Sequence, residues 1–500
     1  MEPSQSKVAA WYLRPAAVGI ALVFLYPLGL VLLNKRPGPR GLARWVAAIG
    51  CFPLFGLVVL LALKPFWVIG GAAGSPGDFS LDFDSLFHND RLEEDRRRQK
   101  SLQSIPSRAA AIDSVPDWTS FRGPNRDGVC IDTDISLDWN RNPPREIYRQ
   151  PIGGGYASFV VAEGRAYTLE QRRGNEAVTC YDFASGRELW AVEYEASFEE
   201  TLGGDGPRAT PTIFVGRLYA LGAQGHLHCL DAATGRILWA HNILQDFGAS
   251  NLRWGLSGSP LIEGNMVIVT GSGDPPPSVF AYDAADGRLI WKSDAGMQAY
   301  SSLVATTLAG RRQILNLGAD SLRGFDPTTG EVLWSYPWPT GMGINCSQPI
   351  PAGDDRIFIS SGYSQGGALL RVEHLAGKFV VTELWQNTRM KNKFTSSVIR
   401  DGFIYGLDEA ILCCLDLTTG ELKWKGGRYQ YGSLLLCGDH LIVLGEQGQL
   451  VLVKADPDGH QELGLVPLFS GKTWNNFVLT GGRLLARNHK EMVCLDLRPN

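Results

Sequence analysis

The sequence lacks an excess of either charge. Its 500 residues carry 47 Lys and Arg against 51 Asp and Glu, which gives a formal net charge of −4. Proteins that bind nucleic acid hold the phosphate backbone with clustered cations, and this composition offers no surplus of them. We therefore expect no nucleic-acid partner.

The short motifs of several enzyme classes are also missing. The sequence contains no HExxH zinc motif, no P-loop and no Gly-x-Ser-x-Gly nucleophile elbow. Residues 203–206 (GGDG) lack the other ligands of a calcium-binding hand. His226 and His228 would share one face of a strand, but no third metal ligand accompanies them. These absences leave hydrolase, nucleotide-binding and metal-binding functions without support.

Long apolar runs occur only near the N-terminus, at residues 13–33 and 42–63. Each run approaches the ~20 residues that a helix needs to cross a bilayer, so we predict a transmembrane hairpin over residues 1–70. The short loop between the runs is basic, which places it in the cytoplasm. Its cations are Lys35, Arg36, Arg40 and Arg44. With Trp67 as an interfacial anchor, the remainder of the chain would face the periplasmic, extracytoplasmic side of the cell (inner) membrane.

Residues 71–117 change composition twice and are predicted to form a spacer. A Gly-, Ala-, Ser- and Pro-containing run comes first, and the charged stretch 88–100 follows it. Opposite charges balance within that stretch, which favours a solvated, partly helical stalk over a binding arm. Residues 118–144 then form an N-terminal extension to the next domain.

A motif recurs through the rest of the chain, which is rich in Gly (58) and Trp (14). Residues 180–190 read CYDFASGRELW, and residues 229–239 read CLDAATGRILW. Three further full copies occupy residues 281–291, 324–334 and 414–424. The aspartates at 182, 231, 283 and 326 are 49, 52 and 43 residues apart, which fits a repeat of four strands. We therefore expect an all-β propeller.

Each conserved type of motif residue has a structural explanation. Asp caps a tight turn, Gly adopts the positive φ that the turn needs, and Trp on the outer strand packs between neighbouring blades. We assign these residues to the architecture. They are Asp182, Gly186, Trp190, Asp231, Gly235, Trp239, Asp283, Gly287, Trp291, Asp326, Gly330, Trp334, Trp385, Asp416, Gly420 and Trp424.

Three weaker copies bring the number of blades to eight. Trp385 survives in a copy that lacks the aspartate, residues 455–459 keep only the turn, and residues 494–497 stop before the outer strand. Residues 145–150 (REIYRQ) precede the first repeat and would supply the missing outer strand. Pairing the two ends removes the exposed sheet edges of an open ring. We predict an eight-bladed propeller over residues 145–500.

The motif resembles the repeat of pyrroloquinoline-quinone-like propellers. This resemblance covers about 350 residues, and the leader 117–128 (DWTSFRGPNRDG) resembles that of uncharacterised bacterial propellers of the same group. The group includes quinoprotein alcohol dehydrogenases and the outer-membrane assembly protein BamB. The resemblance therefore implies either an enzyme or a binding scaffold, since a fold does not specify a function.

The dehydrogenase alternative implies a vicinal disulfide over the quinone, a calcium ion held by carboxylate and amide oxygens, and a catalytic aspartate. Cys413 and Cys414 are adjacent, but residues 410–416 (AILCCLD) read as a strand whose side chains alternate. We expect two buried thiols there, and small core residues at Cys180, Cys229 and Cys494. We predict no cofactor, with pyrroloquinoline quinone and calcium as the alternative.

Polar and aromatic residues recur at the start of each blade's first strand, which lines the central channel of a propeller. The serines and threonines fit a crowded axis, whereas the larger side chains suit a ligand. The predicted ligand-binding set is Tyr156, Arg208, Trp254, Tyr300, Asn345, Gln348, Lys393, Tyr431, Trp474 and Asn475. We expect a non-catalytic scaffold with a protein, peptide or glycan partner at the channel mouth, and a quinone-dependent alcohol dehydrogenase as the alternative.

Overall fold

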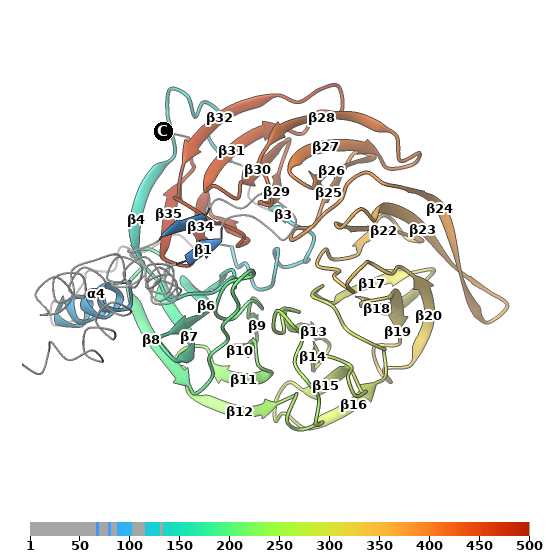
Figure 1. Ribbon diagram of the computed structural model, residues 1–500, viewed down its shortest axis with the longest axis horizontal. Coiled ribbons are helices and arrows are strands. Elements are labelled where there is room, and N and C mark those ends of the chain that lie inside the picture. The colour runs from blue at the N-terminus through green and yellow to red at the C-terminus, as the bar shows by residue number, and fades with distance from the viewer. Residues whose placement is uncertain (1–66, 70–78, 82–87, 103–115, 131–133, 500) are drawn as a thin grey trace, which may run out of the picture. The chain divides into compact units, whose positions relative to one another are not determined.

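Eight blades of four strands each follow one another around a central axis, which confirms the predicted propeller (Figure 1). The sheet of one blade gains a fifth strand, β3 (Val129–Cys130), from the segment that precedes the propeller. The computed structural model describes residues 67–69, 79–81, 88–102, 116–130 and 134–499. The two predicted membrane spans, residues 13–33 and 42–63, lie outside these ranges. Within the described ranges, no helix combines the length and the apolarity that crossing a bilayer requires.

The first four blades run in chain order. Blade 1 contains β5 (Val160–Ala162), β6 (Arg165–Arg172), β7 (Asn175–Asp182) and β8 (Glu188–Tyr194). Blade 2 contains β9 (Thr212–Phe214), β10 (Arg217–Leu221), β11 (His226–Asp231) and β12 (Ile237–Asn242). Blade 3 contains β13 (Leu261–Glu263), β14 (Met266–Thr270), β15 (Val279–Asp283) and β16 (Leu289–Ser293). Blade 4 contains β17 (Val304–Leu308), β18 (Arg311–Leu317), β19 (Ser321–Phe325) and β20 (Val332–Pro337).

The remaining blades complete the ring. Blade 5 contains β21 (Ile350–Pro351), β22 (Arg356–Ser361), β23 (Gly366–Leu375) and β24 (Lys378–Asn387). Blade 6 contains β25 (Val398–Arg400), β26 (Phe403–Asp408), β27 (Ile411–Asp416) and β28 (Leu422–Arg428). Blade 7 contains β29 (Ser433–Cys437), β30 (His440–Leu444), β31 (Gln449–Lys454) and β32 (Glu462–Pro467). Blade 8 contains β33 (Val478–Thr480), β34 (Arg483–Arg487), β35 (Glu491–Asp496) and β4 (Arg145–Pro151).

Blade 8 closes the ring with strands from both ends of the propeller. β4 pairs antiparallel with β35, from Arg145 opposite Asp496 to Pro151 opposite Glu491. The ring of Tyr148 in β4 packs where a Cβ on Gly186 would stand 2.6 Å from it, and its hydroxyl donates to the Phe183 carbonyl of blade 1 at 3.3 Å. The predicted outer strand at residues 145–150 is therefore confirmed.

The motif turns join the third and fourth strands of their blades. In blade 2, Asp231 Oδ1 accepts hydrogen bonds from the Thr234 N–H at 2.9 Å and the Thr234 hydroxyl at 2.7 Å. Gly235 follows with φ +75°, the left-handed region that glycine occupies without strain. The carboxylate and the glycine together reverse the chain over four residues.

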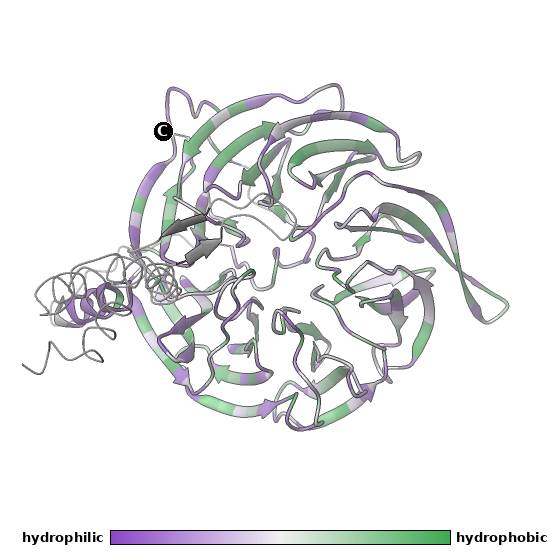
Figure 2. Cartoon of the chain, in the orientation of Figure 1, coloured by the Kyte–Doolittle hydropathy of each residue, from purple (hydrophilic) through white to green (hydrophobic). Residues whose placement is uncertain are grey.

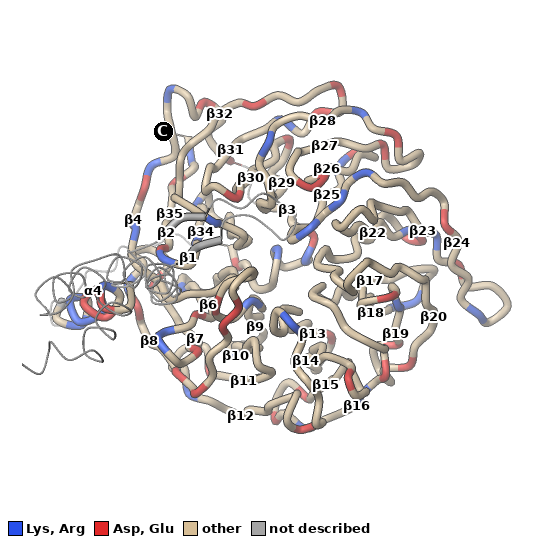
Figure 3. The backbone as a smooth tube through the Cα atoms, in the orientation of Figure 1, with Lys and Arg blue, Asp and Glu red and all other residues tan. Residues whose placement is uncertain are grey.

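Hydrophobic residues fill the space between neighbouring sheets. One cluster joins Tyr219 and Cys229 of blade 2 to Val267 and Phe280 of blade 3. Figure 2 shows hydrophobic colour on many inner strands and mixed colour along the outer strands. Figure 3 shows acidic and basic residues interspersed around the outer edge. Further clusters lie between other neighbouring sheets, so the core follows the ring as a series of separate clusters.

The described residues belong to two compact units. The first unit includes β1 (Trp67–Ile69) and β2 (Phe79–Leu81), which pair antiparallel with Trp67 opposite Leu81. The second unit includes the propeller and helix α4 (His88–Leu102). The region predicted as a spacer thus contains regular structure.

Helix α4 packs on the propeller through charged side chains. Arg96 pairs with Glu188 and, at 3.3 Å, with the buried Glu170 of blade 1. Gln99 donates to Gln150 at 3.1 Å, and Leu92 is 2% exposed. The helical part of the stalk prediction is confirmed, but its full solvation is wrong, because the balanced charges find partners on the propeller as well as within the helix.

Residues 116–130, which we call the arm, lie against the innermost strands of several blades. The arm pairs Trp118 with Val161 of blade 1, and Thr119 accepts a hydrogen bond from Ile213 of blade 2 at 2.9 Å. It ends in β3 (Val129–Cys130), which runs parallel to β29 of blade 7. Partners on three separate blades place the arm across the axis of the ring, where Figure 1 draws it in cyan.

Two buried arginines fasten the arm to further blades. Arg122 donates to the Ser397 carbonyl of blade 6 at 2.8 Å. Arg126 donates to the carbonyl oxygens of Ser259 at 3.1 Å and Pro260 at 2.9 Å, at the start of blade 3. Burial lowers the pKa of Arg122 to about 10 and that of Arg126 to about 9. The arm is therefore held inside the propeller by hydrogen bonds to several blades.

Candidate functional site

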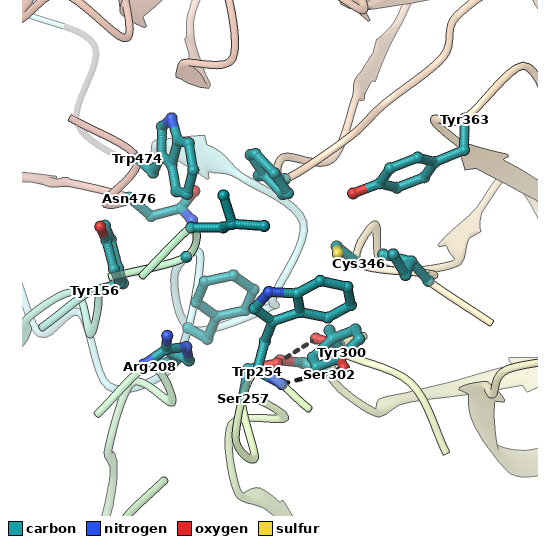
Figure 4. Close-up of a pocket in the computed structure, with 15 residues that line it drawn as sticks. Tyr156, Arg208, Trp254, Ser257, Tyr300, Ser302, Cys346, Tyr363, Trp474 and Asn476 are labelled. Atoms are coloured by element: carbon teal, nitrogen blue, oxygen red, sulfur yellow. Dashed lines mark hydrogen bonds between the residues drawn. The ribbon is translucent and has the colours of Figure 1, made fainter. Parts of the chain in front are cut away.

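A cavity of about 170 Å³ opens at one end of the propeller axis (Figure 4). Its walls come mainly from the segments that precede the first strands of the blades, together with Phe121 of the arm and Tyr363 of the turn between β22 and β23. The lining residues are Phe121, Tyr156, Leu202, Gly203, Arg208, Trp254, Ser257, Tyr300, Ser302, Ile344, Cys346, Tyr363, Phe394, Trp474 and Asn476. Seven blades contribute to this set, and only a site on the axis is accessible to that many.

Five of the ten predicted ligand-binding residues line this cavity. They are Tyr156, Arg208, Trp254, Tyr300 and Trp474. Each precedes the first strand of its blade, so the repeat brings equivalent positions to the same end of the axis. Figure 4 shows these side chains around the cavity, with Trp254 next to Tyr300 and Trp474 on the side of Tyr156.

Aromatic rings form most of the wall. Tyr156 and Trp474 stack with their ring centroids 5.6 Å apart, and Phe394 lies 4.5 Å from Trp474. Trp254 meets Tyr300 edge to face at 5.8 Å. Rings held by one another in this way lose little freedom when a ligand binds, which preorganises the site.

Three cations lie on the faces of these rings. The Arg208 guanidinium lies 5.6 Å from the centre of Tyr156, and Lys472 Nζ lies 4.3 Å from Trp474. Lys393 Nζ lies 4.4 Å from Tyr431 and 4.9 Å from Tyr363. Burial lowers the pKa of Arg208 and of Lys393 from their ordinary values. The wall is thus aromatic with positive charge on its rings.

Two predicted residues, Lys393 and Tyr431, pack beside the cavity wall. Lys393 is 6% exposed and lies 5.9 Å from the ring of Phe394, which does line the cavity. Tyr431 meets the same ring edge to face at 5.9 Å. They support the wall from the side of blades 6 and 7.

The three predicted amides, Asn345, Gln348 and Asn475, are not among the described residues that line the cavity. Asn345 donates to the Gly318 carbonyl at 2.7 Å, and Asn475 donates to the Gly155 carbonyl at 3.1 Å. These bonds join neighbouring blades, which leaves the two amides with structural contacts. Gln348 is 1% exposed, and its side-chain amide has no hydrogen-bond partner among the described residues.

Hydroxyl groups next to the cavity link one blade to the next. The Ser158 N–H donates to Thr210 Oγ1, the Thr210 N–H donates to Ser259 Oγ, and the Ser259 N–H donates to Ser302 Oγ, each at 3.0 Å. The backbone N–H of Gln348 donates in the same way to Ser396 Oγ at 2.9 Å. These small polar residues therefore satisfy backbone donors around the axis.

Several residues that line the cavity were not predicted from the sequence. Cys346, Phe394 and Asn476 each adjoin a predicted residue, so the repeat could have indicated them. Phe121, Leu202 and Tyr363 belong to segments outside the repeated positions, and only the fold brings them to the cavity. Burial raises the pKa of the Cys346 thiol to about 12, so the thiol is protonated and unreactive at neutral pH.

The features expected of a quinone centre are not assembled here. Cys413 and Cys414 are both buried free thiols in β27, and their side chains belong to different hydrophobic clusters. None of the described residues that line the cavity carries a carboxylate. Calcium binds hard oxygen ligands, above all carboxylates, so these residues do not fit a calcium-quinone group.

The two histidines do share a strand face, as expected. The rings of His226 and His228 are nearly parallel, with centroids 6.4 Å apart, and Tyr194 packs 4.5 Å from His228. Burial lowers the pKa of His228 to about 4. Among the described residues, no group of three or more His, Cys, Asp and Glu side chains could hold a metal ion. The pair belongs to an aromatic cluster of blades 1 and 2.

Comparison with known sequences identifies relatives of the propeller. The family model described as outer membrane protein assembly factor BamB matches residues 130–426. The curated BamB of Yersinia pestis is 22% identical over 250 residues, which cover 48% of this chain and 61% of that protein. The dehydrogenase subunit of a quinone alcohol dehydrogenase from Gluconobacter oxydans is 25% identical over 43% of this chain and 29% of its own length. This chain thus spans less than two thirds of these relatives.

Solved structures share the fold. The crystal structure of BamB from Moraxella catarrhalis has a TM-score of 0.50 and 16% identity, covering 71% of this chain and 99% of that chain. A europium-containing methanol dehydrogenase has a TM-score of 0.56 and 13% identity, covering 75% of this chain and 89% of that chain. At these identities the likeness concerns the propeller alone.

Proposed function

Because this chain belongs to the family described as outer membrane protein assembly factor BamB, we propose that it is a non-catalytic scaffold that binds a protein partner. The curated relatives of this name are matched over only part of their length. The name of these relatives therefore supports only the class of function, which is binding between proteins. The evidence for binding by this chain must come from its own cavity.

The cavity at the channel mouth is the observation that carries this proposal. It is walled mainly by aromatic rings and by Arg208, and Trp, Tyr and Arg are the side chains that dominate the energetics of protein interfaces. Its thiol, Cys346, has a pKa raised by burial, and none of its described lining residues is a carboxylate. A site of this composition is suited to binding and offers no general base or activated nucleophile.

We place the partner in the cell envelope. The family description names an outer membrane function, and the two apolar N-terminal runs with a basic loop would anchor the chain with its propeller outside the cytoplasm. An alkaline phosphatase fusion after residue 500 tests this topology. We expect phosphatase activity in intact cells, and an inactive fusion of normal abundance would contradict the orientation.

The dehydrogenase alternative has the fold in its favour but not the site. A cofactor-sized ligand needs a pocket of roughly 300 to 1,000 Å³, whereas this cavity measures about 170 Å³. The adjacent cysteines are buried in β27 and are not among the described residues that line the cavity. For this reason we assign no catalytic residue.

Site-specific photo-crosslinking in cells tests the scaffold directly. A benzoylphenylalanine at Tyr363, in the cavity wall, should yield a covalent adduct with a discrete protein. The matched control carries the same group at Tyr336, on the outer strand β20. We expect the adduct at 363 to be absent at 336 and to disappear when Trp254→Ala is added. No adduct at 363, or one indifferent to Trp254, would refute binding at this mouth.

A further inference from the structure

We propose that the cavity recognises an acidic segment of the partner that inserts one aromatic side chain. This inference rests on the proposed scaffold function and adds the chemistry of the ligand. It combines three observations: the size of the cavity, the composition of its walls, and the arrangement of charge around it.

The volume of the cavity is suited to a single ring. A cavity of about 150 Å³ lined by apolar side chains accommodates benzene, and this cavity measures about 170 Å³. One phenylalanine or tyrosine side chain would therefore fill it. The remainder of the partner must lie outside, over the rim, as the flanks of an interface anchor do.

The walls favour an aromatic side chain over a sugar ring. The Ser257 hydroxyl already donates to the Tyr300 carbonyl at 2.9 Å, and the Ser302 hydroxyl already accepts from the Ser259 N–H at 3.0 Å. Asn476 is the one amide among the described lining residues, and the Tyr156 hydroxyl is their one buried side-chain polar group without a hydrogen-bond partner. A sugar presents several hydroxyl groups that need partners, and burying them without partners costs free energy. Edge-to-face and stacked contacts are instead available from Trp254, Phe394 and Trp474.

Two cations at the mouth of the cavity, Arg208 and Lys472, favour acidic residues next to the aromatic side chain that the partner inserts. Arg208 donates to the carbonyl oxygens of Gly204 and Gly206, and Lys472 approaches those of Leu202 and Gly203 at 3.4 Å each. Carbonyl oxygens do not neutralise a cation, and no carboxylate pairs with either residue among those the structure describes. Both cations therefore remain available to a carboxylate of a partner.

Two of the nearby acids, Glu200 and Asp205, point into their own loop. Glu200 accepts hydrogen bonds from the N–H groups of Leu202, at 2.9 Å, and Gly203. Asp205 accepts one from the N–H of Glu200 at 3.0 Å. These carboxylates thus shape residues 200–206, the loop that offers its carbonyl oxygens to Arg208 and Lys472. The contacts of Glu200 and Asp205 are local, and the buried Glu446 accepts a hydrogen bond from the Trp474 Nε1–H at 2.9 Å. None of these three described carboxylates forms an ion pair with Arg208 or Lys472, so an acidic partner remains favoured.

Peptide titration of the full-length chain in mild detergent tests the inference. The probe is a short fluorescent peptide with one phenylalanine between aspartates, followed by fluorescence anisotropy at low salt. Matched probes replace the phenylalanine by alanine or the aspartates by lysines. We expect saturable binding of the first probe only. Trp254→Ala should weaken it by about thirtyfold, and Lys472→Glu by about tenfold.

Lys292→Glu provides the matched control. Lys292 also lies over an aromatic ring, 5.3 Å from the centre of Phe247, but on the outer strand β16. Its substitution should leave binding of the acidic probe unchanged. Equal binding of the lysine probe, or equal loss with Lys292→Glu, would refute the acidic preference.

Other outcomes separate this inference from the scaffold function. If Tyr363 crosslinks a partner protein but no aspartate probe binds, the ligand class is wrong and the scaffold stands. If a uronic-acid oligosaccharide binds with loss on Trp254→Ala and the peptides do not, the aromatic anchor is refuted. If neither crosslink nor probe binding occurs, both proposals fail together.

Discussion

The indole ring of Trp190 lies against Gly235 of the next blade. A Cβ added to Gly235 would stand 2.8 Å from Cδ2 and Cε3 of that ring, while the indole Nε1–H donates to the Ala232 carbonyl of the same turn at 3.3 Å. The motif therefore works between blades as well as within them. The tryptophan of one repeat seals the turn of the following repeat, so the glycine is needed for its absent side chain as well as its φ.

Comparing Gly235→Ala with Gly216→Ala separates the requirement for positive φ from the requirement for an absent side chain. It should lower the free energy of unfolding by about 3 kcal/mol, because strain at positive φ adds to overlap with the indole. Gly216→Ala is the matched control, since Gly216 has φ +68° and nothing within 4 Å of an added Cβ. We expect a loss of about 1 kcal/mol there. Equal losses in urea unfolding would contradict the packing role of Trp190.

Tyr148 performs the same sealing role where the ring closes. Its ring covers Gly186 of blade 1, the glycine of the first motif turn. Tyr148→Ala should cost about 3 kcal/mol through the lost packing, whereas Tyr148→Phe should cost about 1 kcal/mol through the hydrogen bond to Phe183. Thermal melts of the three proteins measure the difference. A Tyr148→Ala protein as stable as wild type would show that β4 does not hold the ring closed.

The buried Glu170 makes stability depend on pH. Burial raises the pKa of this carboxyl, but Arg172, Arg96 and Arg487 outweigh it and hold the pKa at about 2. A carboxyl group whose pKa is lowered in the folded state stabilises the fold above its unfolded-state pKa of ~4.3. This stabilisation is lost as the pH falls toward the folded-state pKa. We expect Glu170 to account for about 3 kcal/mol of stability lost between pH 5 and pH 2.

Glu170→Gln should remove that part of the acid sensitivity. The variant should be less stable than wild type at pH 7, because three guanidinium groups lose their carboxylate partner. Its free energy of unfolding should then decrease less than that of wild type as the pH is lowered. Glu195→Gln, at an exposed position, is the control. Parallel pH profiles for wild type and Glu170→Gln in thermal melts would contradict the assignment.

The arm should loosen when Arg126 is replaced. Arg126→Ala removes hydrogen bonds to the carbonyl oxygens of Ser259 and Pro260, each contributing about 1.5 kcal/mol or more when the donor is charged. Limited proteolysis should then cut between residues 117 and 128 faster. Arg145→Ala, at an exposed arginine that pairs with Asp496 at 3.1 Å, should leave that rate unchanged. An unaltered cleavage rate in Arg126→Ala would exclude a bracing role.

The periodic features of the molecule were predictable from sequence, because each repeats a local rule. The motif turns, the tryptophans and the closing strand at residues 145–150 all follow from spacing and turn chemistry. Five of the ten predicted ligand-binding residues lie in the candidate site as well, since Tyr156, Arg208, Trp254, Tyr300 and Trp474 occupy equivalent repeat positions.

The features that were not predicted correctly depend on single long-range contacts. No local pattern indicates that Arg96 pairs with Glu170, which is 74 residues away, so the charged stretch read as solvated. The arm lies in the axis through bonds to residues more than 100 positions distant, such as that from Arg122 to Ser397. The amides of Asn345 and Asn475 turned toward carbonyl oxygens of neighbouring blades, which a repeat pattern cannot distinguish from turning toward a ligand.

Titration of the full-length chain with pyrroloquinoline quinone and calcium tests the central claim most directly, namely that the mouth cavity is a non-catalytic binding site. Calorimetry and a dye-linked alcohol oxidation assay provide the readouts. We predict no saturable binding and no oxidation, because the cavity is small and its described lining carries no carboxylate. One-to-one binding that Trp254→Ala abolishes, with alcohol oxidation, would contradict the scaffold and make this propeller a dehydrogenase.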